Sequence, residues 1–171
     1  MKANDIFRRI RYILDLDDSR MIAMFAEADR DVTRAQISAW LKKDDDPGYE
    51  ECADPIFATF LNGLINQKRG KKDGPQPDPE EDLNNNVILR KLKIAFDLQA
   101  DEILSILSLA DFYVSKHELS ALFRRPGHKH YRDCKDQFLR NFLQGMQIKY
   151  RGESLFDGED DVPEASPVKQ Q

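Results

Sequence analysis

The residues best suited to chemistry in this chain are its two cysteines, which lie in a motif that occurs twice. Tyr49–Asp54 has the sequence YEECAD and Tyr131–Asp136 has the sequence YRDCKD, so Tyr, Cys and Asp recur at the same spacing. A cysteine near the N-terminus of a helix has a lowered pKa and forms a reactive thiolate. The motif therefore raises the hypothesis of twin nucleophilic sites.

A structural interpretation of this motif is favoured over the nucleophilic one. Asp54, which precedes a proline, is predicted to be a helix N-cap, Cys52 a small buried residue, and Tyr49 a residue that packs the incoming loop. The residue after the tyrosine changes from Glu to Arg, and no base is kept at a fixed position. The equivalent residues Tyr131, Cys134 and Asp136 have the same predicted roles. Both cysteines are expected to be free thiols.

Other chemical motifs are weak or missing. His128, His130 and Cys134 have the side chains that zinc prefers, but their spacing matches no standard site, and the other copy of the motif has no such histidines. The chain also lacks a glycine-rich phosphate loop, a G-x-S-x-G sequence and an H-E-x-x-H sequence. We therefore expect no catalytic, cofactor or metal site, and a protein that is not an enzyme.

The recurring motif belongs to a duplication of nearly the whole chain. Residues 4–70 align with residues 86–152 without a gap, and 18 of the 67 pairs are identical. We call these segments the first and the second repeat. Residues that both repeats keep are needed for the fold or for a shared function.

Each repeat is predicted to contain four helices and no strand, because its apolar residues recur at helical spacing. In the first repeat the helices are expected at about residues 4–14 and 18–28, from Thr33 to about Lys42, and at 55–69. Asn4 is a predicted N-cap for the first of them. Thr33 with Gln36, and Ser115 with Glu118, have the spacing of capping boxes.

Glycines at equivalent positions complete this prediction. Gly63 and Gly145 interrupt the fourth helix of each repeat, which costs about 1 kcal/mol, so we expect close helix packing there. Gly70 and Gly152 are expected to end the same helices in a left-handed conformation.

The predicted architecture is an all-α protein with two tandem homologous four-helix repeats related by pseudo-twofold symmetry. The expected parts are residues 1–70, a proline-rich charged linker at 71–85, the second repeat at 86–152 and an acidic disordered tail at 153–171. The N-terminus does not have the pattern of a signal peptide, and no apolar run has the length of a membrane span. A cytoplasmic location without membrane association is expected.

Charge is distributed unequally between the repeats. The first repeat has a net charge of −3 and the second of +5, so the second alone is suited to binding phosphates. Its candidate basic face consists of Lys116, Arg124, Arg125, Lys129, Arg132 and Lys135. The simpler alternative is a solvated surface that pairs with the acidic surface of the first repeat. The tail, with a net charge of −5, is hypothesised to shield the basic face.

The second and third helices of each repeat partly match a helix-turn-helix. The runs VTRAQIS and VSKHELS fit the start of a recognition helix. The turn glycine is missing, because Asp31 and Tyr113 stand at its place, and the connection is slightly too long. This pattern makes a nucleic-acid-associated protein the second hypothesis for function.

Several segments resemble a known family. NDIFRRIRYILDLDD, AQISAWLKK, GYEECAD and FLNGLINQKRG are similar to a bacterial family known as YehS-like, a duplicated domain of unknown function, and the resemblance spans residues 4–152. It implies a small bacterial cytosolic protein with tandem copies, and it provides no substrate, cofactor or catalytic residue. The favoured function is a non-enzymatic adaptor module that binds a protein partner.

Overall fold

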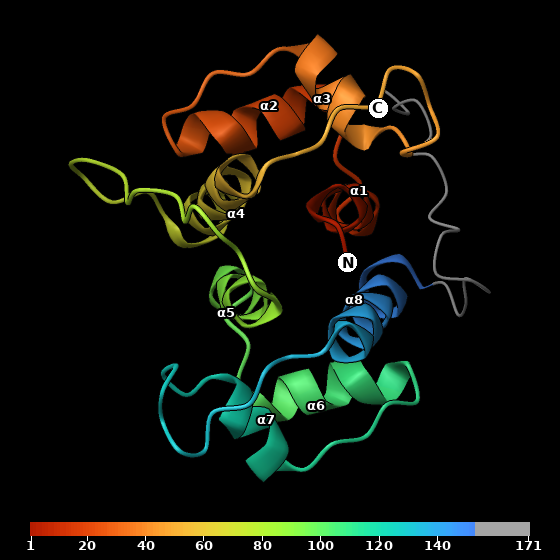
Figure 1. The fold of residues 1–171 in the computed structure, drawn as a ribbon, viewed down its shortest axis with the longest axis vertical. Helices are drawn as coiled ribbons and strands as arrows, with labels where there is room; N and C mark the ends of the chain where they lie inside the picture. Colours follow the sequence, from red (N-terminus) through yellow and green to blue (C-terminus); the bar gives the residue numbers. More distant parts are fainter. Residues whose placement is uncertain (153–171) are drawn as a thin grey trace. The chain divides into compact units, whose positions relative to one another are not determined.

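The computed structural model describes residues 1–152, and the predicted acidic tail lies outside them. The described residues contain eight helices and no strand, which confirms the all-α fold with two four-helix repeats (Figure 1). They divide into one unit that spans Met1–Leu83 and another that begins at Asn84. The helices are α1 (Ala3–Ile13), α2 (Asp18–Glu27), α3 (Arg34–Leu41) and α4 (Asp54–Arg69) in the first unit, and α5 (Asn85–Ala95), α6 (Ala100–Leu109), α7 (Lys116–Leu122) and α8 (Asp136–Arg151) in the second.

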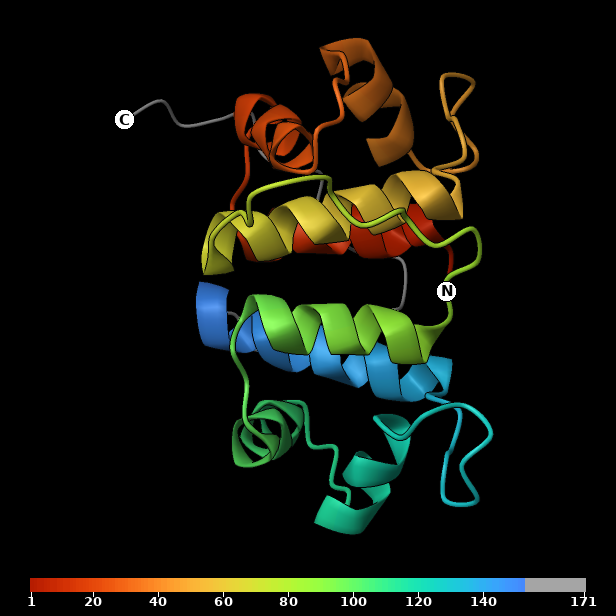
Figure 2. The same cartoon turned by 90° about the vertical axis from the view of Figure 1, so that its left-hand side faces the viewer.

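The long last helix of each repeat is the base on which the second helix packs. The main helix contact in the first repeat joins α2 to α4, and in the second it joins α6 to α8. Figures 1 and 2 together show that α2 lies across α4, and α6 across α8. The short helix α3 contacts α1 and α2, and α7 contacts α6. Both repeats therefore share the packing of the second helix on the last, whereas the contact of α3 with α1 is not matched by a comparable one between α7 and α5.

The predicted close packing at the helix glycines is confirmed. A Cβ atom added to Gly63 would lie 1.7 Å from the backbone oxygen of Met24, and one added to Gly145 would lie 2.0 Å from that of Ile106. Real Cβ atoms do not approach backbone this closely. Glycine is therefore required at the point where α2 crosses α4 and at the equivalent crossing of α6 over α8.

Local signals at the helix ends are also largely confirmed. Thr33 with Gln36, and Ser115 with Glu118, form the predicted capping boxes. Gly70 and Gly152 follow the last helices with φ values of 98° and 66°, and Gly152 is fully left-handed. Four aspartates that were not predicted to be special also have positive φ: Asp15, Asp29, Asp97 and Asp111. Aspartate tolerates this conformation better than most residues, and here it ends the first two helices of each repeat.

Three predicted N-caps are wrong, and two of them lie in the first repeat. The N-cap of α1 is Lys2, and Asn4 lies buried within the first turn. The N-cap of α4 is Ala53, whose carbonyl oxygen begins the helical hydrogen bonds, so Asp54 is already the first helical residue. From there the Asp54 carboxylate accepts the backbone N–H of Leu83 at 2.8 Å and still faces the positive end of the helix.

Asp136 departs from the N-cap prediction in the same way. The N-cap of α8 is Lys135, which makes no side-chain capping bond, and Asp136 is the first residue of the helix. The Asp136 carboxylate accepts a hydrogen bond from the side-chain amide of Asn85 at 2.7 Å. Both aspartates therefore connect the start of the last helix to residues at or before the start of α5.

The cores of the two repeats have large apolar residues at equivalent positions, but these are aromatic in the first repeat and mostly aliphatic in the second. In the first repeat five rings pack together, and the closest pair, Phe7 and Phe60, has ring centroids 4.9 Å apart. These rings belong to Phe7, Phe25, Trp40, Phe57 and Phe60, and the equivalent residues of the second repeat are Leu89, Leu107, Leu122, Leu139 and Phe142. The fold therefore needs large apolar groups at these positions and does not need aromatic ones.

Candidate functional site

The duplicated motif closes a loop onto the first helix of each repeat through a buried asparagine. The amide of Asn4 donates to the carbonyl oxygens of Trp40 and Glu50 at 3.0 and 2.8 Å, and its Oδ1 accepts the N–H of Cys52 at 2.9 Å. Asn86 makes the equivalent bonds to Leu122, Arg132 and Cys134 at 3.0, 2.9 and 2.9 Å. The motif is therefore held in place in each repeat by one asparagine, and the first of the two, Asn4, was predicted to be a helix cap. We call these two sets of hydrogen bonds the asparagine clasps.

The geometry of the cysteines favours the structural interpretation. Cys52 and Cys134 are buried free thiols. Burial, together with the neighbouring Asp54 carboxylate, raises the pKa of Cys52 to about 12. Burial and Asp136 raise the pKa of Cys134 to about 12 as well. A thiol with such a pKa is protonated at neutral pH, so neither cysteine has the properties of an activated nucleophile.

The two tyrosines of the motif have different partners. The hydroxyl of Tyr49 donates to Asn4 Oδ1 at 3.2 Å. Partial burial and a hydrogen bond to the Asp133 carboxylate raise the pKa of Tyr131 above its ordinary value. The tyrosine thus supports the asparagine clasp in the first repeat and turns to a neighbouring side chain in the second.

The loops before the motif have one backbone arrangement and opposite charges. We call residues 42–51 the acidic loop and residues 124–133 the basic loop, because their net charges are −3 and +3. Equivalent backbone hydrogen bonds close both loops: 46 to 43, 49 to 46 and 50 to 39 in the first repeat, and 128 to 125, 131 to 128 and 132 to 121 in the second. The change of charge therefore leaves the loop's hydrogen-bonded framework unchanged.

A histidine replaces a carboxylate within this framework. Asp46 Oδ1 accepts the N–H of Gly48 at 2.7 Å, and at the equivalent place His128 Nδ1 accepts the N–H of His130 at 3.0 Å. His130 also lies near His117, with ring centroids 6.3 Å apart. Within residues 1–152, no group of three or more His, Cys, Asp or Glu side chains is arranged to hold a metal ion.

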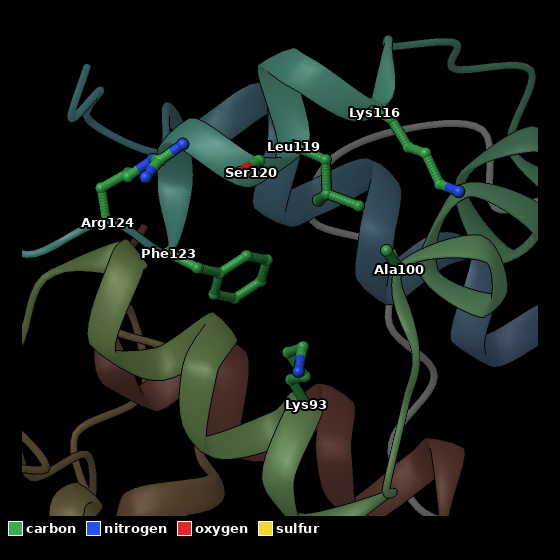
Figure 3. A pocket seen from close by; sticks show the side chains of 7 residues that line it. All are labelled: Lys93, Ala100, Lys116, Leu119, Ser120, Phe123 and Arg124. Atoms are coloured by element: carbon green, nitrogen blue, oxygen red, sulfur yellow. The ribbon is translucent and has the colours of Figure 1, made fainter.

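Two residues of the predicted basic face, Lys116 and Arg124, line a groove in the second repeat. Four others, Arg125, Lys129, Arg132 and Lys135, are exposed on the basic loop and just before α8 and do not line it. The groove has a volume of about 360 Å³ (Figure 3). Its lining residues are Lys93 from α5, Ala100 from α6, and Lys116, Leu119, Ser120, Phe123 and Arg124 from α7 and the start of the basic loop. We call it the cationic groove.

Lys93 and Phe123 are two of the five groove residues that were not part of the predicted basic face. The Lys93 ammonium lies 5.7 Å from the centre of the Phe123 ring, a cation–π distance that links α5 to the end of α7. A signal was present, because the equivalent of Lys93 in the first repeat is the basic residue Arg11. It was not interpretable without knowing that α5 and α7 face each other.

The equivalent place in the first repeat holds an internal counter-ion. Asp18 accepts from Arg11 at 2.5 Å and lies 3.7 Å from Arg34. In the second repeat Ala100 stands at the position of Asp18, and no carboxylate pairs with Lys93 or Arg124 among residues 1–152. Lys116 pairs with the exposed Asp101 at 3.1 Å, and exposed pairs of this kind are weak. The cationic groove therefore keeps its cations available.

Comparison with known proteins identifies first the class and then the family. The fold and the paired clasps define a duplicated all-helical protein, and residues 3–70 and 85–152 each match the family described as "Protein of unknown function (DUF1456)". The chain belongs to this family. It is also 46% identical over 150 residues to the "Uncharacterized protein YehS" of Escherichia coli (strain K12), which covers 87% of this chain and 96% of that protein. The expected YehS-like resemblance is thus confirmed.

The comparisons add no chemical assignment to the groove. No solved structure matches the chain. Among residues 1–152, no helix combines the length and the apolar character that crossing a membrane requires.

Proposed function

We propose that this protein is a non-enzymatic binding module whose second repeat binds nucleic acid through its phosphates. The observation that carries this proposal is the loss of the internal counter-ion. The carboxylate that pairs with two arginines in the first repeat is replaced by Ala100 in the second, next to Lys93 and Lys116. Lys116 has only the exposed Asp101 as a partner, and Lys93 has no carboxylate partner among residues 1–152. Cations of this kind around a groove attract phosphates, which bind by releasing the counterions of the nucleic acid.

The basic loop supports the proposal by extending the positive surface beyond the groove. Arg125 and Lys129 are exposed, and the loop carries a net charge of +3 on a framework that carries −3 in the first repeat. The two loops keep the same backbone hydrogen bonds while the net charge of their side chains reverses. This supports a functional role for the positive charge in the second repeat. Nucleic-acid binding of this kind fits a cytoplasmic protein.

Fluorescence anisotropy with labelled 20-nucleotide single strands and duplexes, across a salt series, tests this function. We expect affinity to fall steeply with salt. The double variant Arg124→Ala/Arg125→Ala should weaken binding and reduce the salt slope by about 1 to 2, because each lost phosphate contact removes about 0.7 to 0.9. The matched control is Lys42→Ala/Lys43→Ala at the equivalent positions of the acidic loop, which should leave binding unchanged.

Two results would contradict the proposal. One is equal loss of binding in both double variants. The other is competition by poly-glutamate as effective as that by nucleic acid, because the site would then accept any polyanion. A chain that ends at Gly152 provides a further arm. Removal of the tail's net charge of −5 should strengthen binding if that segment shields the groove.

A protein partner is the second candidate function, and exposed apolar side chains favour it. Leu109 and Tyr113, at and just beyond the end of α6, are 45% and 75% exposed. Their equivalents in the first repeat are the charged residues Glu27 and Asp31. Exposed Tyr and Leu are groups that protein interfaces bury.

The duplication also provides the test for an adaptor role. Leu109→Glu/Tyr113→Asp places the residues of the first repeat on the second. A partner captured from bacterial lysate by the natural chain should be lost with this variant and retained with Arg124→Ala/Arg125→Ala. A partner that both variants retain equally would count against this surface.

A further inference from the structure

We propose that the cationic groove binds one nucleotide of a single-stranded nucleic acid, with its base against Phe123 and its flanking phosphates at the surrounding cations. This inference rests on the proposed function and goes further by naming the form of nucleic acid and the stacking residue. It makes Phe123 the residue that distinguishes a single strand from a duplex.

The groove has cations at its ends and an apolar surface between them. Figure 3 shows Arg124 at one end and Lys116 with Ala100 at the other. Phe123 and Leu119 lie between these ends, and Lys93 lies opposite α7. Proteins that bind single strands combine these two elements, because cations follow the backbone while aromatic rings stack on bases. The exposed Ser120 hydroxyl adds a hydrogen-bonding group to the same wall.

The size of the groove favours a single nucleotide over a duplex. Its volume of about 360 Å³ is at the lower end of the range of small-ligand pockets, about 300 to 1,000 Å³. The bases of a duplex are stacked on one another and cannot reach a ring inside such a groove. A single strand can turn one base into it, and base–aromatic stacking does not depend on sequence.

The first repeat differs from this arrangement at two positions, those of Phe123 and Ala100. The equivalent of Phe123 is Leu41, which offers no ring for stacking. The cations Arg11 and Arg34 are joined by Asp18, so phosphates would compete with a carboxylate already in place. The inference therefore applies to the second repeat alone, and the first provides matched substitutions that the fold accepts.

Two strands of equal length separate base stacking from phosphate binding. One is oligo-dT and the other is an abasic strand that keeps the phosphates and lacks the bases. We expect the natural chain to bind oligo-dT about five- to a hundredfold more tightly than the abasic strand. Phe123→Leu should abolish this preference without changing the salt slope, whereas Phe123→Trp should retain it.

Ala100→Asp and Leu41→Phe complete the design. Ala100→Asp restores the counter-ion of the first repeat and should weaken binding to both strands alike. Leu41→Phe adds a ring to the place in the first repeat that holds the counter-ion and should change nothing. Circular dichroism and fluorescence of Trp40, the single tryptophan, verify that each variant is folded.

The outcomes separate this inference from the proposed function. If Phe123→Leu keeps the full preference for oligo-dT, or if the natural chain binds both strands equally, the stacking site is wrong. Phosphate binding would still stand if Arg124→Ala/Arg125→Ala weakens it. If the natural chain binds no strand and no duplex at low salt, both proposals are wrong.

Discussion

The two repeats each have an open groove, but at different places. The cationic groove of the second repeat lies between α5, α6 and α7, where the first repeat holds the ion pairs of Asp18. A groove in the first repeat has a volume of about 390 Å³ and is lined by residues of α2, the end of α4 and the segment after α1, including Leu14, Met24 and Lys68. At the equivalent place in the second repeat, the rings of Phe96 and Tyr150 pack 5.5 Å apart.

This comparison indicates that the two repeats share one backbone framework and differ in their surfaces. The asparagine clasps, the capping boxes and the helix glycines are the same in both repeats. The grooves, loop charges and core aromatics are not. Residues that set backbone geometry were retained because each has contacts on several sides, whereas groove residues can change one at a time. The following predictions test this division, starting from the largest expected effect.

The helix glycines should be equally indispensable in both repeats. Gly63→Ala and Gly145→Ala each place a methyl group against backbone, at 1.7 Å from Met24 oxygen and 2.0 Å from Ile106 oxygen. We expect each to lower the free energy of unfolding by about 3 kcal/mol or more, despite the better helix propensity of alanine. Urea denaturation followed by circular dichroism measures this, with Gln137→Ala on α8 as a neutral control. Tolerance of either alanine would mean that the crossings are looser than the structure has them.

The asparagine clasps should rank second. Asn4→Ala and Asn86→Ala each leave buried backbone groups without partners, and we expect a loss of about 2 to 3 kcal/mol in each case. Fluorescence of Trp40 reports the first repeat directly, because Asn4 binds the Trp40 carbonyl oxygen. If Asn4→Ala lowers the free energy of unfolding and Asn86→Ala does not, the second clasp is dispensable.

Removal of the tyrosine hydroxyl should have different effects on stability in the two repeats, and both effects should be smaller than those of the asparagine variants. Tyr49→Phe removes the hydroxyl bond to Asn4 and should cost about 1 kcal/mol. Tyr131→Phe removes a bond to Asp133 that is not part of the clasp, and its effect should stay within about 0.5 kcal/mol. Thermal unfolding of the two variants side by side measures the difference. Equal effects would contradict the different roles of the two hydroxyls.

The thiols should show the smallest contrast between the repeats. Cys52 and Cys134 both have a pKa raised to about 12 from an ordinary value of 9.0, so both should react slowly with a thiol reagent near neutral pH and quickly after unfolding. As the pH rises, the folded state loses these protons at a higher pH than the unfolded state does. Their contribution to stability is therefore complete below pH 9 and is lost as the pH rises toward 12. One fast thiol in the native protein would overturn the equivalence.

The sequence was most informative where the controlling interactions are local. The capping boxes and the glycine crossings were predictable, because a cap involves residues three apart and a helix glycine present in both repeats indicates a close neighbour. Asn4 and Asp54 were misassigned because the prediction considered only their local sequence. Both are cap-forming residue types near a helix start, yet their partners, Glu50 and Leu83, are distant in sequence.

The sequence by itself therefore determined the duplication, the helices and the unequal charge of the repeats. Only the tertiary structure decided that Lys93 and Phe123 join Lys116 and Arg124 in one groove, and that Ala100 leaves this groove without a carboxylate. The physical reason is that helix patterns are encoded by residues within one or two turns. A groove instead depends on which faces of separate helices meet, and that is set by the packing of the whole repeat.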